Sequence, residues 1–359
     1  MADDEYKPCH ELSTISKGLH RNFFIWSERP YGLAGGLHLD PCNNPISVTA
    51  LYRWIDLILN TPTPFDLFHV QIAPVDLLAV FTYRITPVGD ALPRTSTELL
   101  RSGDVGIIGP GELPLCGLVD GRPACIPLPY KQRSFFYLEA YLRETHPETD
   151  LKYRITRPLI KCVRTRDHHC CVITGTPESA GAPLTATWIC PPFIVTNPCG
   201  HDSNRNKAEL EEAIAPFLTV SNGLTFREDI AELFSQNSFG IDVDDNYRIV
   251  FFGPHEDYAP LHPRTHLDMS HTDPATRPSD VYLRQHFIRC LKHVMLGGDV
   301  YQEYQYVDLT GFLEARGVYD GEVDPADPEW LTPYGKAAWD MLIRHKLRCS
   351  IQEGGYVGD

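Results

Sequence analysis

Cysteine and histidine side chains in the middle of the chain could form a zinc site. Cys190, Cys199 and His201 carry the thiolate and imidazole groups that zinc prefers in a tetrahedral array, and Cys170 or Cys171 could complete the set. The spacing differs from that of a zinc knuckle, because eight residues separate Cys190 from Cys199 and the other two cysteines are adjacent. We therefore interpret these cysteines as free thiols and expect no metal there.

Three further side chains could act as an acid, a base or a ligand: His168, Asp229 and Glu232. Asp229 stands in the first turn of an expected helix, where a carboxylate interacts favourably with the helix dipole. His168 fits a surface loop. Both residues therefore have a structural interpretation beside a catalytic one.

Short strands and helices are expected around these residues. Hydrophobic pattern and turn residues predict strand-like chain at 151–171, a strand at 184–190, helices at 206–215 and 227–234, and a hairpin with strands 239–243 and 247–252. The basic run at 152–166 alternates with apolar residues, and we interpret it as the solvated face of a strand.

The flanking regions are expected to form separate units. Residues 1–19 are interpreted as a flexible tail, and residues 20–155 as an N-terminal α+β domain with a helix at 47–60 and strands within 70–85 and at 103–108. Residues 254–359 are expected to hold a His- and Pro-rich loop at 254–278 and helices at 279–295 and 333–347. The fold class predicted for the whole chain is α+β.

Composition restricts the partners. The chain has 32 Lys and Arg against 47 Asp and Glu, a formal net charge of -15, and a surface of that sign repels a phosphate backbone. We therefore expect no nucleic-acid partner. No apolar run approaches the roughly 20 residues that span a bilayer, so no membrane partner is expected. Eleven cysteines without a leader segment indicate reduced thiols in the cytoplasm, with the nucleus as an alternative.

The segment 166–252 resembles the HNH endonuclease family, in particular the variety found in many uncharacterised fungal proteins. The resemblance is carried by Arg166 to Gly175, Thr185 to Pro191, Asn222-Gly223-Leu224, Asp229 to Phe234 and the hairpin at 239–252. It implies a ββα-metal domain at 156–253, and the domain before it is similar to the companion domain of those fungal proteins.

The resemblance also implies that nuclease chemistry is lost. The family's general base falls on Trp188, whose indole has no basic nitrogen, and a metal-ligand histidine falls on Ala231, whose methyl group cannot coordinate an ion. Asn222 keeps the motif asparagine that orients the loop. Thr187 is at best a weak ligand. We expect no metal and no cofactor.

The sequence favours a different function for the cleft that the resemblance implies. Trp188 and Asn222, with Phe226 and Phe234, are expected to line an apolar pocket in which a small molecule undergoes cyclisation, cycloaddition or rearrangement without metal. One alternative is a catalytically inactive binding or regulatory protein. Another is a divalent-metal nuclease with displaced ligands, drawn from His168, Asp229 and Glu232.

Overall fold

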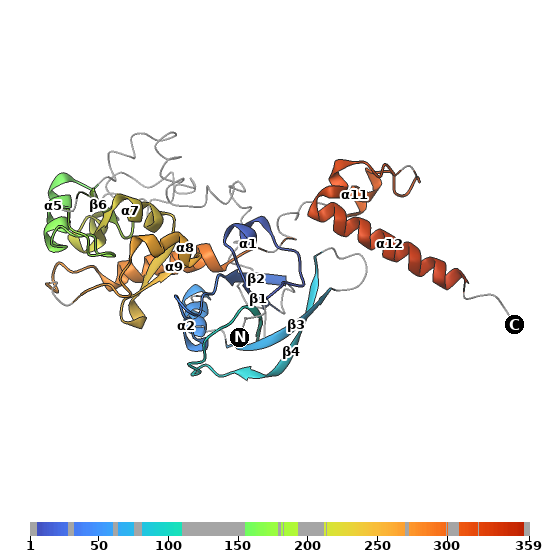
Figure 1. Cartoon of the computed structure of the whole chain (residues 1–359), viewed down its shortest axis with the longest axis horizontal. Coiled ribbons are helices and arrows are strands. Elements are labelled where there is room, and N and C mark those ends of the chain that lie inside the picture. The colour runs from blue at the N-terminus through green and yellow to red at the C-terminus, as the bar shows by residue number, and fades with distance from the viewer. Residues whose placement is uncertain are drawn as a thin grey trace.

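The computed structural model describes residues 6–27, 32–59, 64–74, 81–109, 155–178, 181, 183–192, 212, 214–269, 273–298, 300, 309–321 and 323–354. Helices and mixed sheets share these residues (Figure 1), so the predicted α+β class is confirmed. Cys199, His201 and most of the helix expected at 206–215 lie outside the described residues.

A five-stranded sheet organises the N-terminal part of the chain. Its strands are β1 (Phe23–Ser27), β2 (Gly32–Leu37), β3 (Asp66–Pro74), β4 (Tyr83–Leu92) and β5 (Gly103–Ile108), in the order β2-β1-β5-β3-β4. β1 and β5 run parallel, and the other neighbouring pairs are antiparallel. Helix α2 (Val48–Leu59) buries its apolar side in the core that this sheet provides. The helix expected at 47–60 and the strand expected at 103–108 are confirmed.

Residues 6–19 are folded where we expected a tail. Helix α1 (Thr14–Gly18) starts after Ser13, whose side chain accepts a hydrogen bond from Ser16 N at 3.0 Å as an N-cap. His10, Ser13 and Ser16 are buried. Arg21 donates to the carbonyls of Val294, Leu296 and Gly297. The described residues before position 20 therefore belong to the folded body.

A ββα unit follows in the middle of the chain. Strand β6 (Leu184–Trp188) pairs antiparallel with β7 (Gly223–Arg227), and helix α7 (Glu228–Ser235) follows β7 directly and packs against both strands. The strand predicted at 184–190 and the helix predicted at 227–234 are both found, with shifted ends.

The chain before β6 corrects one prediction. Residues 157–166 form helix α5 (Arg157–Arg166) instead of a strand. Pro158 stands in the first turn, where its fixed backbone angle favours a helix start. Val163 is the apolar side chain that this helix buries. The basic and apolar residues that alternate along the sequence therefore do not form the two faces of a strand.

Helix α9 (Asp280–Met295) joins the two parts. Its Phe287, Cys290 and Leu291 belong to the core of the N-terminal sheet, whereas Leu283 belongs to the core of the ββα unit. The hairpin of β8 (Phe239–Asp242) and β9 (Arg248–Phe251), which the sequence predicted, packs on the same helix. At Gly35 an added Cβ would lie 1.6 Å from the Met295 carbonyl oxygen, so the close approach of β2 to the end of α9 requires glycine.

The C-terminal unit consists of α11 (Leu309–Glu314) and α12 (Pro333–Gly354) with the turn between them. Phe312, Trp330 and Tyr334 lie in its core. Phe81, two residues before β4, packs into the same core. Figure 1 shows α12 leading away from the sheet towards the C-terminus. No helix among the described residues is long and apolar enough to cross a membrane.

Candidate functional site

Asn222 closes the loop between β6 and β7. Its Oδ1 accepts a hydrogen bond from Cys190 N at 2.8 Å, and its Nδ2 donates to the carbonyls of Cys190 at 2.8 Å and Phe217 at 2.9 Å. Its own carbonyl accepts from Ile189 N at 2.9 Å. The side chain is fully buried, so its amide is engaged in holding the backbone where the two strands meet.

The positions expected for the base and the metal ligand lie inside this unit. Trp188 is the last residue of β6, pairs in register with Gly223 and is only 8% exposed. Ala231 is equally buried on α7, and Ser235, one turn later, donates its hydroxyl to the Ala231 carbonyl at 2.9 Å. Thr187 is half-buried. The Trp188 indole and the Ala231 methyl group supply neither a base nor a strong metal ligand, and the Ser235 hydroxyl is bonded to its own helix.

The candidate acids have other partners. Asp229 forms an ion pair with Arg227, and the hydrogen bond from that guanidinium, followed by their charge attraction, lowers the pKa of the carboxyl. Glu232 is exposed and accepts from Gln236 Nε2 at 3.0 Å. His168 is exposed in a left-handed turn with φ of 54°. In the described part of the chain, no three His, Cys, Asp or Glu side chains are grouped so as to hold a metal ion.

The two phenylalanines expected to bind a ligand are packed in the core. Phe226 and Phe234 are fully buried, with ring centroids 4.8 Å apart. Phe234 also stacks on His286 at a centroid distance of 3.7 Å. Their rings therefore fill the interior under α7, and no described contact exposes them to a cleft.

Sequence reasoning did not identify the ion pair that supports the loop closed by Asn222. Arg166 and Asp167 are almost completely buried and joined at 2.8 Å. Asp167 accepts from Thr225 N at 2.8 Å, and Arg166 donates to the carbonyls of Val220 and Gly223 at 2.8 and 2.7 Å. This pair fixes the backbone on either side of Asn222. The one sequence signal for this pair was that Arg166 and Asp167 are adjacent at the start of the segment 166–252.

The thiols of Cys171 and Cys190 are packed in the interior. Cys171 is buried, and Cys190 donates its Sγ hydrogen to the Tyr282 carbonyl at 3.4 Å. Burial raises the pKa of the Cys190 thiol, which disfavours the thiolate that zinc binds. We preferred free thiols to a zinc set of Cys190, Cys199 and His201, and this prediction stays untested because Cys199 and His201 lie outside the described residues.

Comparison with known proteins does not identify a function. Family models, curated proteins and solved structures gave no significant match. The likeness of this segment to HNH nucleases therefore stays a prediction that rests on its own residues and on the ββα arrangement.

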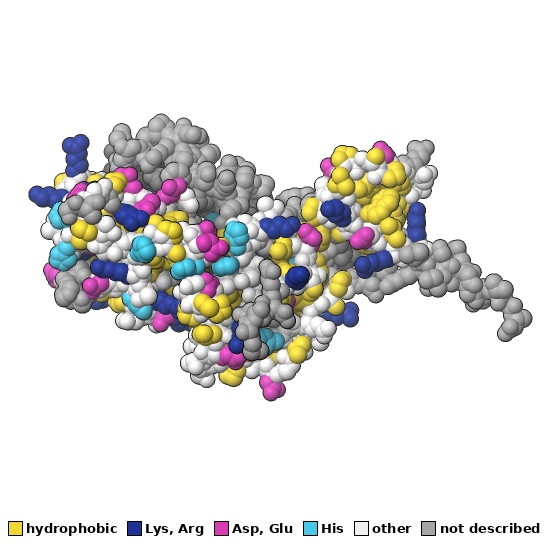
Figure 2. Space-filling model, in the orientation of Figure 1, with side chains coloured by type: hydrophobic (Ala, Val, Ile, Leu, Met, Phe, Trp, Pro, Cys, Tyr) yellow, Lys and Arg dark blue, Asp and Glu magenta, His cyan; other side chains and the backbone are white. Residues whose placement is uncertain are grey.

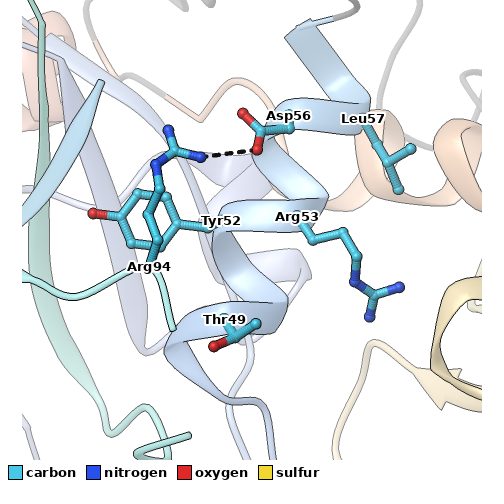
Figure 3. A pocket seen from close by; sticks show the side chains of 6 residues that line it. All are labelled: Thr49, Tyr52, Arg53, Asp56, Leu57 and Arg94. Atoms are coloured by element: carbon cyan, nitrogen blue, oxygen red, sulfur yellow. Dashed lines mark hydrogen bonds and ion pairs between the residues drawn. The ribbon is translucent and has the colours of Figure 1, made fainter. Parts of the chain in front are cut away.

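A surface hollow lies elsewhere, on α2. Its volume is about 380 Å³. Figure 3 shows the side chains that line it: Thr49, Tyr52, Arg53, Asp56, Leu57 and Arg94. Arg94 lies over the Tyr52 ring at 4.5 Å and pairs with Asp56 at 3.0 Å, whereas Arg53 points away from this pair. Within the hollow, Arg94 and Asp56 thus neutralise each other, and Arg53 is paired with Asp242 outside the lining.

Proposed function

We propose that this chain is a binding protein built on a ββα scaffold that does not cut nucleic acids. One observation carries the proposal: Trp188 and Ala231, each only 8% exposed, stand at the two positions where the resemblance places the base and the metal ligand. The Asn222 carboxamide keeps the loop-orienting role that the resemblance gives it, with its oxygen and both N–H groups bonded to the backbone of Cys190 and Phe217. These bonds stabilise the loop and leave the amide no N–H to donate to a substrate.

The chemical requirements of phosphodiester hydrolysis support the same conclusion. Hydrolysis of a phosphodiester at this site needs a base to activate water and a metal to stabilise charge on the phosphate. At these two positions Trp188 and Ala231 supply neither group, and the candidate carboxylate Asp229 is paired with Arg227. The scaffold is kept while the groups that would perform the chemistry are replaced.

We propose a protein as the partner. The net charge of -15 disfavours nucleic acid. Apolar side chains gather on the C-terminal unit (Figure 2), where Tyr319, Leu331 and Ile343 are exposed. Exposed apolar patches on a soluble chain are typical of protein contact sites. The proposed contact is therefore an apolar protein surface that covers this unit.

Site-specific photo-cross-linking tests this contact. A photoreactive amino acid at Leu331 is expected to give one dominant adduct in an extract of the source cells, and the same group at the exposed Val281 on α9 is the control. The protein identified in the adduct is then purified, and it should bind the wild type but not Leu331→Asp. Equal adducts at both positions, or equal binding by Leu331→Asp, would refute the contact.

The metal-independent enzyme that the sequence favoured stays a prediction. It requires a cavity beside Trp188, yet Phe226 and Phe234, two of its expected walls, are core residues. Incubating the folded chain with lipophilic precursors and following product by mass spectrometry would test it. Turnover lost in Trp188→Ala would replace the scaffold proposal with the enzyme.

We also propose an intracellular location, cytoplasmic or nuclear. Cys9, Cys42 and Cys162 are exposed as free thiols in the described part of the chain. Free surface thiols suit a reducing compartment. Fractionation of source cells would test this location, and recovery of the chain from a secreted fraction would contradict it.

A further inference from the structure

Residues 6–13, called the N-terminal strap below, cover one face of the five-stranded sheet. Side chains alternate along β1, so Phe24 and Trp26 face the strap while Phe23 and Ile25 belong to the core on the α2 side. The strap-side cluster also contains Leu33 and Ile85, with Tyr6 and Leu12 of the strap packed against it. This short segment therefore helps to shield the two aromatic rings, together with Val70, Ile72 and Tyr83 of the sheet.

Two polar contacts hold the strap in place. The Tyr6 hydroxyl donates to Asp104 Oδ2, and the other oxygen of this carboxylate accepts from Trp26 Nε1 at 2.8 Å. The backbone N–H of Glu11 donates to the Tyr83 hydroxyl at 3.3 Å. The strap is therefore attached near both ends by hydrogen bonds to side chains of the sheet.

Between these contacts, His10 is inserted into an aromatic recess. Its ring is 7% exposed and meets Phe24, Trp26 and Tyr83 nearly edge-on, at centroid distances of 4.5, 4.8 and 6.0 Å. Neither ring nitrogen has a hydrogen-bond partner among the described residues. A neutral imidazole tolerates this environment, but an imidazolium would lose its water without gaining an acceptor.

We propose that the N-terminal strap is an acid-released cover: protonation of His10 loosens it from the sheet and exposes the aromatic face formed by Phe24, Trp26 and Tyr83. The proposal is independent of the function assigned to the ββα unit, since the recess lies on the five-stranded sheet and not on the sheet of β6 and β7.

The pH range follows from the histidine. Burial lowers the pKa of His10 from 6.5 to about 4, whereas a released strap would present a histidine with the ordinary value. Docking is therefore constant above pH 6.5, weakens as the pH falls because the released form binds the proton, and levels off below pH 4. Docking should be about 30-fold weaker at pH 5 than at pH 7.5.

The other titratable groups around the recess have different effects. Burial raises the pKa of the Asp104 carboxyl, so its protonation favours the docked strap and opposes release at the acidic end. Burial also raises the pKa of Tyr6 and of the Cys9 thiol, which keeps both neutral in this range. Glu11 is exposed and pairs with Lys17 at 3.1 Å, away from the imidazole. His10 is thus the group that drives release on acidification.

Hydrogen exchange of the full chain tests the proposal. After correction for intrinsic exchange, protection of a peptide spanning residues 6–13 should fall about 30-fold from pH 7.5 to pH 5 in the wild type and less than threefold in His10→Phe. His69→Phe, which changes an exposed histidine on β3 of the same sheet, should follow the wild type. Asp104→Asn should keep the fall.

Two results would overturn the proposal. One is a protection profile that is flat in the wild type or equal in His10→Phe and the wild type. The other comes from nuclear magnetic resonance of labelled histidines in the unmodified chain, where His10 should titrate far below 6.5. A midpoint near 6.5 with the strap still protected would contradict it, and this measurement stands even if His10→Phe does not dock its strap.

Discussion

The carboxamide of Asn222 holds the backbone of Cys190 on both sides, with Oδ1 accepting from its N–H and Nδ2 donating to its carbonyl, each at 2.8 Å. This contact joins the chain just after β6 to the chain just before β7, although Cys190 and Asn222 are 32 positions apart in sequence. Trp188, two residues before Cys190, is only 8% exposed. The stability of the ββα unit should therefore depend on this amide.

Replacement of Asn222 by alanine should lower the free energy of unfolding by about 2–4 kcal/mol, because it leaves buried N–H and carbonyl groups of Cys190 and Phe217 without partners. Urea unfolding measures this change. Gln236→Ala, which removes an amide that bonds only at the surface of α7, should cost less than about 0.5 kcal/mol. Equal effects of the two substitutions would contradict the role given to Asn222.

The sequence predicted the regular elements well where local signals agree with burial. The amphipathic helix at 47–60, the strand at 103–108 and the hairpin around Asp244 were confirmed, because periodicity and turn residues determine them locally. The run at 152–166 was predicted wrongly as a strand. Its alternating basic residues resembled a strand face, whereas packing of Val163 on β7 stabilises a helix that this pattern does not reveal.

A second prediction concerns the contact between α5 and β7. A Cβ added at Gly223 would lie 2.8 Å from Val163 Cγ2, so Gly223→Ala should destabilise the chain by about 1–3 kcal/mol through overpacking. Shortening the facing side chain makes room for the new methyl group. In a double-mutant cycle, Gly223→Ala with Val163→Ala should therefore cost less than the sum of the single changes, and strict additivity would rule out the contact.

A third prediction concerns the link between α2 and β8. Arg53 donates to both carboxylate oxygens of Asp242 at 2.6 and 2.8 Å, and Asp242 is 1% exposed. Arg53→Ala leaves that carboxylate buried without its cation, so thermal or urea unfolding should show a loss of about 2–4 kcal/mol. Arg284→Ala breaks the half-exposed pair with Asp244 and should cost less than about 1 kcal/mol. A loss at Arg53 no larger than this control would contradict the prediction.

A fourth prediction is a pH dependence from His286. Its ring is buried against Phe234, and burial, followed by the charge of Arg289, lowers the pKa of His286 well below 6.5. The unfolded chain binds a proton below pH 6.5 and the folded chain does not, so stability is full above 6.5 and falls on acidification. Between pH 7.5 and 5.5 the wild type should lose about 1.4 kcal/mol more than His286→Phe in urea unfolding. Parallel profiles would exclude His286 as the source.

The site was harder to predict than the fold. Asn222 and Trp188 were singled out from the sequence and do lie at the junction of β6 and β7. Phe226 and Phe234 were expected beside a ligand and instead fill the core, because a residue type shows that a side chain is apolar but not whether an interior or a cleft receives it. The burial of the Arg166 and Asp167 pair depends on contacts more than 50 residues away, which local pattern cannot supply.

The central claim is that the ββα unit is a scaffold without nuclease activity, and a plasmid-nicking assay with the purified full chain tests it most directly. Supercoiled DNA is incubated with magnesium, manganese or zinc. The account predicts no nicking above the protein-free background with any of the three ions. Metal-dependent nicking by the wild type that is lost in Asp229→Asn, Glu232→Gln or His168→Asn would contradict it and identify a nuclease with displaced ligands.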